Sequence, residues 1–319
     1  MKCFVIIFSL CVFLLLGCHV ERIEVPESNS SYLLVAHVKE EMLSFIDIHT
    51  NELYIEGTSP VSITDLAYVG NGKVLLTSES EASVMELDLQ EGTLSPFIEL
   101  NQGLTALLYD KQDWFYVADT INHTIHRVSI SDQKVIGDID IGAYPVDLEH
   151  GVNELFVLSG DEHKVTVVDK ELQQSLMTFS VVERPAGMYF DGERLWVGGH
   201  GPYGDLNQMI YAYDPESGEL LETLEVGLMP IAFYADETSP NLYVLCHGEH
   251  AIYQIDQIAN EVVDVLPVGQ NPNQVIGNKE HLYVSNLDGD SITVIERDSF
   301  EVVAELPVAA GPYAMVLGE

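Results

Sequence analysis

The sequence predicts an all-β protein, a seven-bladed β-propeller of four-stranded blades that is closed by a C-terminal strand joining the N-terminal blade. Three observations predict this fold. A short apolar strand recurs seven times at intervals of about 40 residues, which is the length of one propeller blade. A second strand ends fourteen residues after the start of the first in six of the seven copies. The last strand of the chain has no blade of its own.

The first strand of each repeat begins with a leucine, valine or aromatic residue. The seven starts are Leu33, Val74, Phe115, Leu155, Leu195, Leu242 and Leu282. In six copies the second strand ends at Asp47, Asp88, Ser129, Asp169, Asp256 and Glu296. The fifth copy reaches Asp214 only after nineteen residues, so five extra residues lie in its loop, around residues 201–204.

A third strand of alternating apolar and polar residues follows in each repeat, as in residues 262–268, and leads into a turn. The turn ends at a proline in five repeats: Pro145, Pro185, Pro230, Pro272 and Pro312. A fourth strand starts just after this position. The last one, from Tyr313 to Leu317, is followed by no blade, and the repeat at Leu33 has no such strand before it. We expect these two ends to pair, because closure removes open sheet edges.

The N-terminus has the features of an export signal. One lysine precedes an apolar run from Phe4 to Leu16, which is too short to span a bilayer as a helix. The run ends in Leu15-Leu16-Gly17-Cys18, which resembles the lipobox of bacterial lipoprotein precursors. We therefore predict a signal peptide at 1–17, an acylated Cys18 with a polar tether at 18–31, and the propeller at 32–319. Acyl chains on Cys18 would anchor the protein to the outer face of a bacterial membrane, in the cell envelope.

Composition narrows the classes of partner. The chain carries 13 Lys and Arg against 51 Asp and Glu, a formal net charge of −38. Such a surface repels phosphate backbones, so nucleic-acid binding is not expected. After removal of the signal and acylation of Cys18, Cys246 is the one free thiol, so no disulfide can form within the mature chain. Because Cys246 lies in a strand pattern, we expect it to be buried.

The repeats also resemble known propeller families. Leu282-Tyr283-Val284-Ser285-Asn286, followed by the strand at 292–296 and the strand at 302–308, is similar to the YVTN-type repeat. Residues 115–123 resemble an NHL-type repeat. The resemblance spans essentially Leu33 to Glu319 and implies the propeller fold. It does not imply one function, because these families include scaffolds, binding proteins and domains attached to enzymes.

Candidate ligand-binding residues come from two places. The loops between the first two strands of each repeat are rich in histidine and acid, and we expect them to share one face with the loops that precede the prolines. These loops supply His37, Asp119, His123, His163, His200, His247, His250, Asp288 and Asp290. The wall of the central channel, taken two residues after each proline position, is apolar or small except for Asp147 and Gln274.

Two interpretations of these residues stay open. They are solvated polar turns, or several loops converge to hold a divalent metal, for which imidazole and carboxylate are the usual ligands. No pair has a diagnostic ligand spacing, and no nucleophile elbow or phosphate loop is present. We therefore predict a non-enzymatic, lipid-anchored module without a cofactor that binds a ligand or an envelope or surface protein. The alternative is a metal-dependent propeller enzyme, lactonase-like or redox, that uses the rim histidines and acids.

Overall fold

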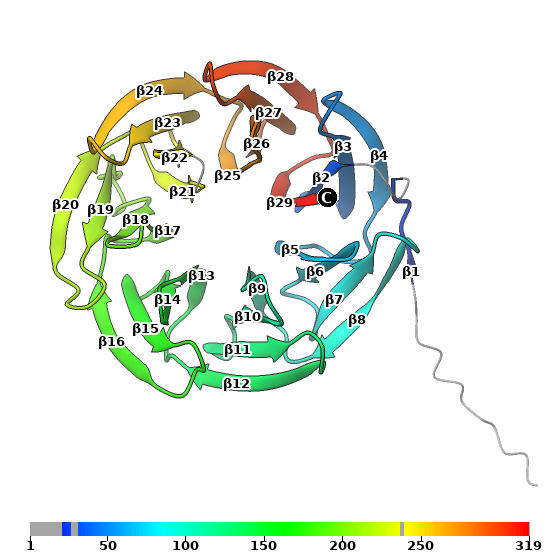
Figure 1. Ribbon diagram of the computed structural model, residues 1–319, viewed down its shortest axis with the longest axis horizontal. Coiled ribbons are helices and arrows are strands. Elements are labelled where there is room, and N and C mark those ends of the chain that lie inside the picture. Colours follow the sequence, from blue (N-terminus) through cyan, green and yellow to red (C-terminus); the bar gives the residue numbers. More distant parts are fainter. Residues whose placement is uncertain (1–20, 27–30, 237–238, 319) are drawn as a thin grey trace, which may run out of the picture.

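The computed structural model describes residues 21–26, 31–236 and 239–318. Seven antiparallel sheets stand around a central axis like the blades of a propeller, and chain order runs around the ring (Figure 1). In each blade the innermost strand lies at the channel, and in six of the seven blades the fourth strand forms the outer edge. The all-β, seven-bladed architecture predicted from the repeats is confirmed. The predicted signal peptide at 1–17 and the predicted acylation site Cys18 lie outside the described residues.

Each blade contains four strands, numbered here from the axis outward. Blade 1 contains β29 (Pro312–Gly318), β2 (Tyr32–His37), β3 (Met42–Asp47) and β4 (Glu52–Thr58). Blade 2 contains β5 (Asp65–Gly70), β6 (Lys73–Thr77), β7 (Ser83–Asp88) and β8 (Thr93–Glu99). Blade 3 contains β9 (Leu104–Tyr109), β10 (Trp114–Asp119), β11 (Thr124–Ser129) and β12 (Lys134–Asp140). Blade 4 contains β13 (Pro145–His150), β14 (Glu154–Ser159), β15 (Lys164–Asp169) and β16 (Ser175–Ser180).

The remaining three blades repeat this order. Blade 5 contains β17 (Pro185–Phe190), β18 (Leu195–Gly199), β19 (Met209–Tyr213) and β20 (Leu220–Glu225). Blade 6 contains β21 (Pro230–Tyr234), β22 (Asn241–Cys246), β23 (Ala251–Asp256) and β24 (Glu261–Pro267). Blade 7 contains β25 (Pro272–Gly277), β26 (His281–Asn286), β27 (Ser291–Glu296) and β28 (Glu301–Pro307).

The ring closes as the sequence predicts. The C-terminal strand β29 pairs antiparallel with β2, from Tyr32 opposite Gly318 to His37 opposite Pro312. A second link crosses the same joint, because Lys39 of blade 1 donates to the carbonyl of Leu287 in blade 7 at 2.7 Å and to Asp288 at 2.8 Å. Blade 1 therefore combines the C-terminal strand β29 with the first three strands of the ring, and the inner side of β2 is paired.

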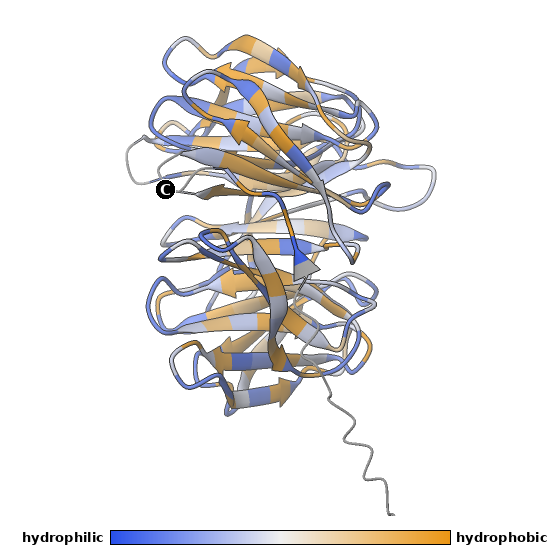
Figure 2. Cartoon of the chain, turned by 90° about the vertical axis from the view of Figure 1, so that its right-hand side faces the viewer, coloured by the Kyte–Doolittle hydropathy of each residue, from blue (hydrophilic) through white to orange (hydrophobic). Residues whose placement is uncertain are grey.

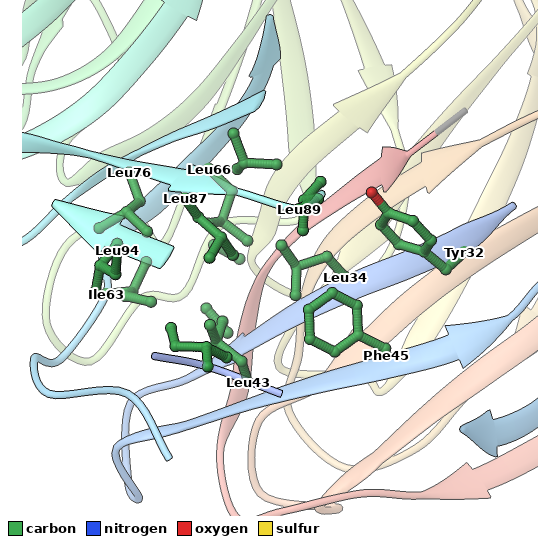
Figure 3. Packing of buried hydrophobic residues seen from close by; sticks show 14 residues of the cluster. Tyr32, Leu34, Leu43, Phe45, Ile63, Leu66, Leu76, Leu87, Leu89 and Leu94 are labelled. Atoms are coloured by element: carbon green, nitrogen blue, oxygen red, sulfur yellow. The ribbon is translucent and has the colours of Figure 1, made fainter. Parts of the chain in front are cut away.

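The hydrophobic core is divided among the joints between blades. The second strand of each blade is buried on both sides, so neighbouring residues in it face opposite joints. In β2, Leu33 and Val35 pack toward blade 7, whereas Leu34 packs toward blade 2. Figure 3 shows Leu34 with its neighbours at the joint of blades 1 and 2. In side view the strands are largely hydrophobic and the loops at the two faces largely hydrophilic (Figure 2). Cys246 is fully buried, and burial raises the pKa of its thiol to about 12.

The acid that ends the third strand of most blades closes the following turn. Asp47 accepts hydrogen bonds from the backbone amides of His49 and Thr50, at 2.8 and 3.0 Å. Asp88, Asp214 and Asp256 do the same in their own blades. A carboxylate in this position satisfies amides that the turn leaves unpaired. The fourteen-residue spacing in the sequence thus runs from the second strand of a blade to the acid that closes the turn after the third strand.

Part of the segment predicted as a tether lies on the propeller. Glu21 and Arg22 form β1, which pairs with the outer strand β8 of blade 2 as a fifth strand. The amide of Ile23 donates to the carbonyl of Gly92 at 2.8 Å, and the Ile23 side chain is buried in the core at the joint of blades 1 and 2. The described part of the chain contains no helix long and apolar enough to cross a membrane.

Candidate functional site

The candidate residues are gathered at one face of the disc, which we call the histidine face. It carries the loops between the second and third strands of each blade and the connections that enter each inner strand. His37, Asp119, His123, His163, His200, His247, His250, Asp288 and Asp290 all lie at or next to these loops. The opposite face carries the short hairpin turns. The loops therefore share one face, but their side chains have different partners.

A first group of candidates holds the backbone of the next blade. His123, His163, His250 and Asp290 end four equivalent loops and have φ between 47° and 57°, a region that few side chains adopt without strain. The Nδ1 atom of His250 accepts from the amide of Asn271 at 3.0 Å, and Asp290 accepts from that of Gly311 at 2.9 Å. The Nδ1 atom of His163 lies 3.0 Å from the amide nitrogen of Arg184. His163, His250 and Asp290 thus join neighbouring blades through the residue before a proline.

A second group forms buried polar ladders inside single blades. In blade 1, the His37 ring donates to Ser44 at 2.7 Å, and the Ser44 hydroxyl donates to Glu56 at 3.0 Å. Burial lowers the pKa of His37 to about 4, so its ring is neutral. Ser44 is fully buried and lies between the histidine and the acid, which is the wrong order for a serine nucleophile.

The same spacing, seven and then twelve residues, recurs in two other blades, and in blade 7 it produces a second hydrogen-bonded ladder. In blade 7, Asn286 donates to Thr293 at 2.8 Å, and Thr293 donates to Glu305 at 2.8 Å. In blade 3, His126 lies 3.8 Å from the buried Asp119. Sequence reasoning singled out His37 and Asp119 but not their partners. The signal was present as the repeated spacing 37–44–56, 119–126–138 and 286–293–305.

The channel side chains connect the inner strands of neighbouring blades. Asp147 accepts from its neighbour Leu148 at 2.9 Å and from Met188 of blade 5 at 2.9 Å. Gln274 accepts from the amide of Met315 in blade 1 at 2.5 Å. Both line a pocket of about 190 Å³ at the mouth of the channel on the histidine face. Each polar side chain therefore satisfies a backbone amide beside the axis.

Blade 2 departs from the channel rule derived from the sequence. Leu66, two residues after the position that proline holds elsewhere, is buried in the core, and Asp65 lines the channel instead. The register of the inner strand explains the difference. In blades 4 to 7, the residue after the proline has no partner in the second strand. In blade 2, Asp65 and Leu66 pair consecutively with Thr77 and Leu76, so the residue that lines the channel is one position earlier. Asp65 accepts from Leu66 and from Leu107 of blade 3, both at 2.8 Å.

The channel carboxyl groups have raised pKa values. Burial raises the pKa of Asp65 to about 6 and that of Asp147 to about 7, against the opposing effect of their amide hydrogen bonds. Burial and the neighbouring Asp147 raise the pKa of Glu149 to about 8. These groups are partly protonated near neutral pH, which reduces the negative charge beside the axis.

The five extra residues of blade 5 lie within a loop on the histidine face, residues 201–206, which we call the insertion loop. Its base is closed by a hydrogen bond of 2.9 Å from the amide of Asn207 to the carbonyl of His200. Tyr203 is 88% exposed and Leu206 is 41% exposed. The guanidinium of Arg184 lies 4.4 Å from the centre of the Tyr203 ring, a cation–π distance. An aromatic ring is thus presented to solvent and supported from one side.

Asn207 fixes the base of this loop and was not identified from the sequence. It is buried, and its amide group donates to the carbonyls of Gly199 and Met209 at 3.0 and 2.7 Å. Its side-chain oxygen accepts from the Met209 amide at 3.0 Å and from the Tyr211 hydroxyl at 3.1 Å. An isolated asparagine in a loop carries no sequence signal that distinguishes this role from a solvated turn.

Two histidines meet beside the insertion loop. His200 follows β18 and His247 follows β22, at equivalent positions of blades 5 and 6, and their ring centres are 5.8 Å apart. A neighbouring pocket of about 430 Å³ is lined by Gln208, Glu225, Val226, Leu228, Gly248, Glu249 and Tyr253. We call the insertion loop, the two histidines and this pocket the blade 5–6 sector.

Close packing at the axis supports this sector. Gly187 of β17 lies so near β21 that a Cβ atom there would collide with the carbonyl of Ile231. The blade 5–6 joint has its own core cluster around Trp196 and Val244. The sector therefore rests on a rigid joint rather than on loops alone.

The remaining candidate, Asp288, is already paired. Its two carboxylate oxygens accept from Lys39 and from the side chain of Asn271, both at 2.8 Å. Within the described ranges, no group of three or more His, Cys, Asp or Glu side chains is arranged to hold a metal ion. The structure thus brings His200 and His247 together, whereas His37, Asp119, His163, His250, Asp288 and Asp290 have partners of other kinds.

A further groove lies away from these residues. It has a volume of about 900 Å³ and lies between blades 4 and 5 at the opposite face, where its lining includes Phe156, Leu176, Phe190 and Leu221. None of the residues predicted from the sequence lines it.

Comparison with known proteins confirms the fold but does not indicate a function. No family model and no curated protein matches the sequence. Among solved structures, a functionally unknown protein from Desulfotomaculum acetoxidans is 17% identical with a TM-score of 0.71, covering 90% of this chain and 99% of that one. Hydrazine synthase of Kuenenia stuttgartiensis is 15% identical with a TM-score of 0.71 over 88% and 96%.

A third similar structure is apo AztD from Citrobacter koseri. It is 13% identical with a TM-score of 0.62, covering 91% of this chain and 98% of that one. At these identities the likeness shows a shared seven-bladed propeller and not a shared activity. The YVTN- and NHL-type resemblance of the repeats stays an expectation.

Proposed function

We propose that the chain is a lipid-anchored, non-enzymatic binding module that contacts an envelope or surface protein through the blade 5–6 sector. The observation that carries this proposal is the insertion loop with its exposed Tyr203. Six copies of the repeat keep the same spacing across this loop, so we expect the longer loop of blade 5 to be where a specific surface is added. Exposed aromatic rings next to an arginine are typical of the residues that dominate binding energy at protein interfaces.

The position of β1 supports the orientation that such a module needs. Cys18 precedes Glu21 by three residues, which span at most ~10 Å. An acylated Cys18 would therefore hold the joint of blades 1 and 2 close to the membrane. Blades 5 and 6 lie across the ring from β1 (Figure 1). In this orientation the blade 5–6 sector is the part of the ring farthest from the lipid and open to partners.

Charge favours a basic surface on the partner. The chain has a net charge of −38, and Asp205, Glu225 and Glu249 lie in or beside the sector. Complementary charges speed the encounter of two proteins and exclude partners of like charge. We expect the association to weaken as salt concentration rises, because exposed charges are screened.

Removal of the insertion loop tests the proposal. Deletion of residues 202–206 restores the loop length of the other blades, and the adjacent Gly201 and Asn207 can still close it. After chemical cross-linking in intact cells, we expect the partner recovered with the deletion variant to fall by roughly tenfold or more, as loss of a binding hot spot does. The matched control is Ile258→Ser, which removes a side chain 86% exposed on the opposite face. Equal recovery with the deletion variant and the wild type would contradict the proposal.

The anchor has a test of its own. Cys18→Ser removes the acylation site, and we expect the protein to move from the membrane fraction to the soluble fraction of cells. If the variant stays in the membrane fraction after a high-salt wash, the lipid anchor is wrong. The proposed binding surface would still be tested separately by the loop deletion.

A further inference from the structure

We infer that His200 and His247 form a binding site for a divalent transition-metal ion such as Zn²⁺, with two protein ligands and open coordination positions. The inference rests on the geometry of the pair and does not depend on the proposed protein partner. Neutral imidazole is the commonest protein ligand of such ions.

The distance between the two rings suits a shared ion. The ring centres are 5.8 Å apart and the planes are inclined by 76°. Two imidazoles on one tetrahedral zinc, with Zn–N distances of ~2.0–2.1 Å, have centres roughly 5 Å apart. The observed separation of the ring centres is therefore within about 1 Å of the separation in such a pair. Both histidines are only partly buried, so an ion can reach them from solvent.

Each ring has a hydrogen-bond partner in the backbone that restrains its orientation. The Nδ1 atom of His247 donates to the carbonyl of Pro272 at 3.2 Å, which leaves the lone pair of Nε2 available. His200 is hydrogen-bonded to the backbone of Arg184. Metal-ligating histidines almost always donate their second nitrogen to a backbone carbonyl, a carboxylate or a water.

The charge state of the rings agrees with this assignment, whereas the guanidinium of Arg184, which also lowers the pKa of His200, is a nearby positive charge. Burial lowers the pKa of both rings, so they are neutral and able to coordinate at pH 7. Asp288 lies near His247 but uses its oxygens on Lys39 and Asn271, and is not a ligand. The protein thus supplies two nitrogens, and water or a donor from a bound molecule fills the other positions.

Zinc titration of the untagged chain tests the inference. We expect isothermal titration calorimetry to show about one equivalent of bound Zn²⁺, and Co²⁺ to give the visible absorption bands of a nitrogen-ligated ion. His200→Ala and His247→Ala should each weaken binding by roughly tenfold or more, whereas His49→Ala, on the opposite face, should leave it unchanged. His200→Gln serves as a second variant that keeps the size of the side chain.

Three results would overturn the inference of a metal site. No binding of Zn²⁺ by the wild type, or unchanged binding by the folded double variant His200→Ala/His247→Ala, would overturn the inference. An equal loss with His49→Ala would also overturn it, because it would point to general attraction by the acidic surface. Deletion of residues 202–206 should leave zinc binding within about twofold, so the failure of one proposal can be told from the failure of the other.

Discussion

His163, His250 and Asp290 explain why histidine and acid recur at the ends of the face loops. Each adopts a positive φ, and each places a hydrogen-bond acceptor at the amide that precedes the next inner strand. Imidazole and carboxylate both provide that acceptor. Their frequency in the sequence, which suggested converging metal ligands, is therefore explained at these three positions by the joints between blades.

Substitution of His250 measures this role. His250→Asn tolerates the positive φ and keeps an acceptor, so we expect the free energy of unfolding to change by less than about 1 kcal/mol. His250→Val has neither property and should lower it by about 2 kcal/mol or more. Urea denaturation at pH 7.5 compares the two variants. Equal loss in both would show that the acceptor and the backbone conformation do not matter.

Glu149 tests the channel carboxyl groups. Its pKa is raised in the folded protein, so its contribution to stability is fully present below its ordinary pKa and is lost as pH rises toward about 8. Glu149→Gln removes this dependence. We expect the variant to match the wild type at pH 4.5 and to exceed it by more than about 1 kcal/mol at pH 9, measured by denaturant unfolding. A stability difference between the two that does not change with pH would contradict the assignment.

At the scale of the strands, β1 is the least expected element. It docks beside Gly92, whose φ is +64° and where a Cβ atom would lie 2.5 Å from the carbonyl oxygen of Ile23. Close approach of the two backbones at this glycine is what lets the segment lie against blade 2. A two-residue strand with a polar composition gives no periodic pattern, which is why the sequence reads as a tether here.

Gly92→Ala should release this strand. We expect faster hydrogen exchange at the amide of Ile23 and faster proteolysis between residues 20 and 31, with the seven blades intact. Gly70→Ala is the matched control, because Gly70 has a φ of +89° in the same blade and nothing within 4 Å of its added Cβ. If both variants behave alike, the effect is backbone strain and not the loss of β1.

The elements that the sequence predicts best are those set by repetition. The strand ends at Asp47, Asp88, Ser129, Asp169, Asp256 and Glu296 agree with the structure to the residue, because each of these residues ends the third strand of its blade just before a turn. The residues that were missed depend on contacts the repeat does not encode. Asp65 lines the channel only because blade 2 lacks the skipped residue, and Asn207 acts only in the presence of the insertion.

At the scale of the whole molecule, the two departures from seven-fold repetition lie on opposite sides of the ring. β1 covers the outer edge of blade 2, and the insertion loop rises from blade 5. In the ring between them, polar side chains such as Asp65, Asp147 and Asp290 accept hydrogen bonds from backbone amides of the neighbouring blade. We therefore propose that the protein is attached to the membrane at one side of the ring and binds its partner at the other.

The most direct test is site-specific photo-cross-linking in intact cells. A photoreactive amino acid replaces Tyr203, 88% exposed on the insertion loop, or Ile258, 86% exposed on the opposite face of blade 6. We predict one discrete cross-linked protein at position 203, none at position 258, and loss of the product when Arg184→Glu is added. The same products at both positions, or none at position 203, would contradict recognition through the blade 5–6 sector.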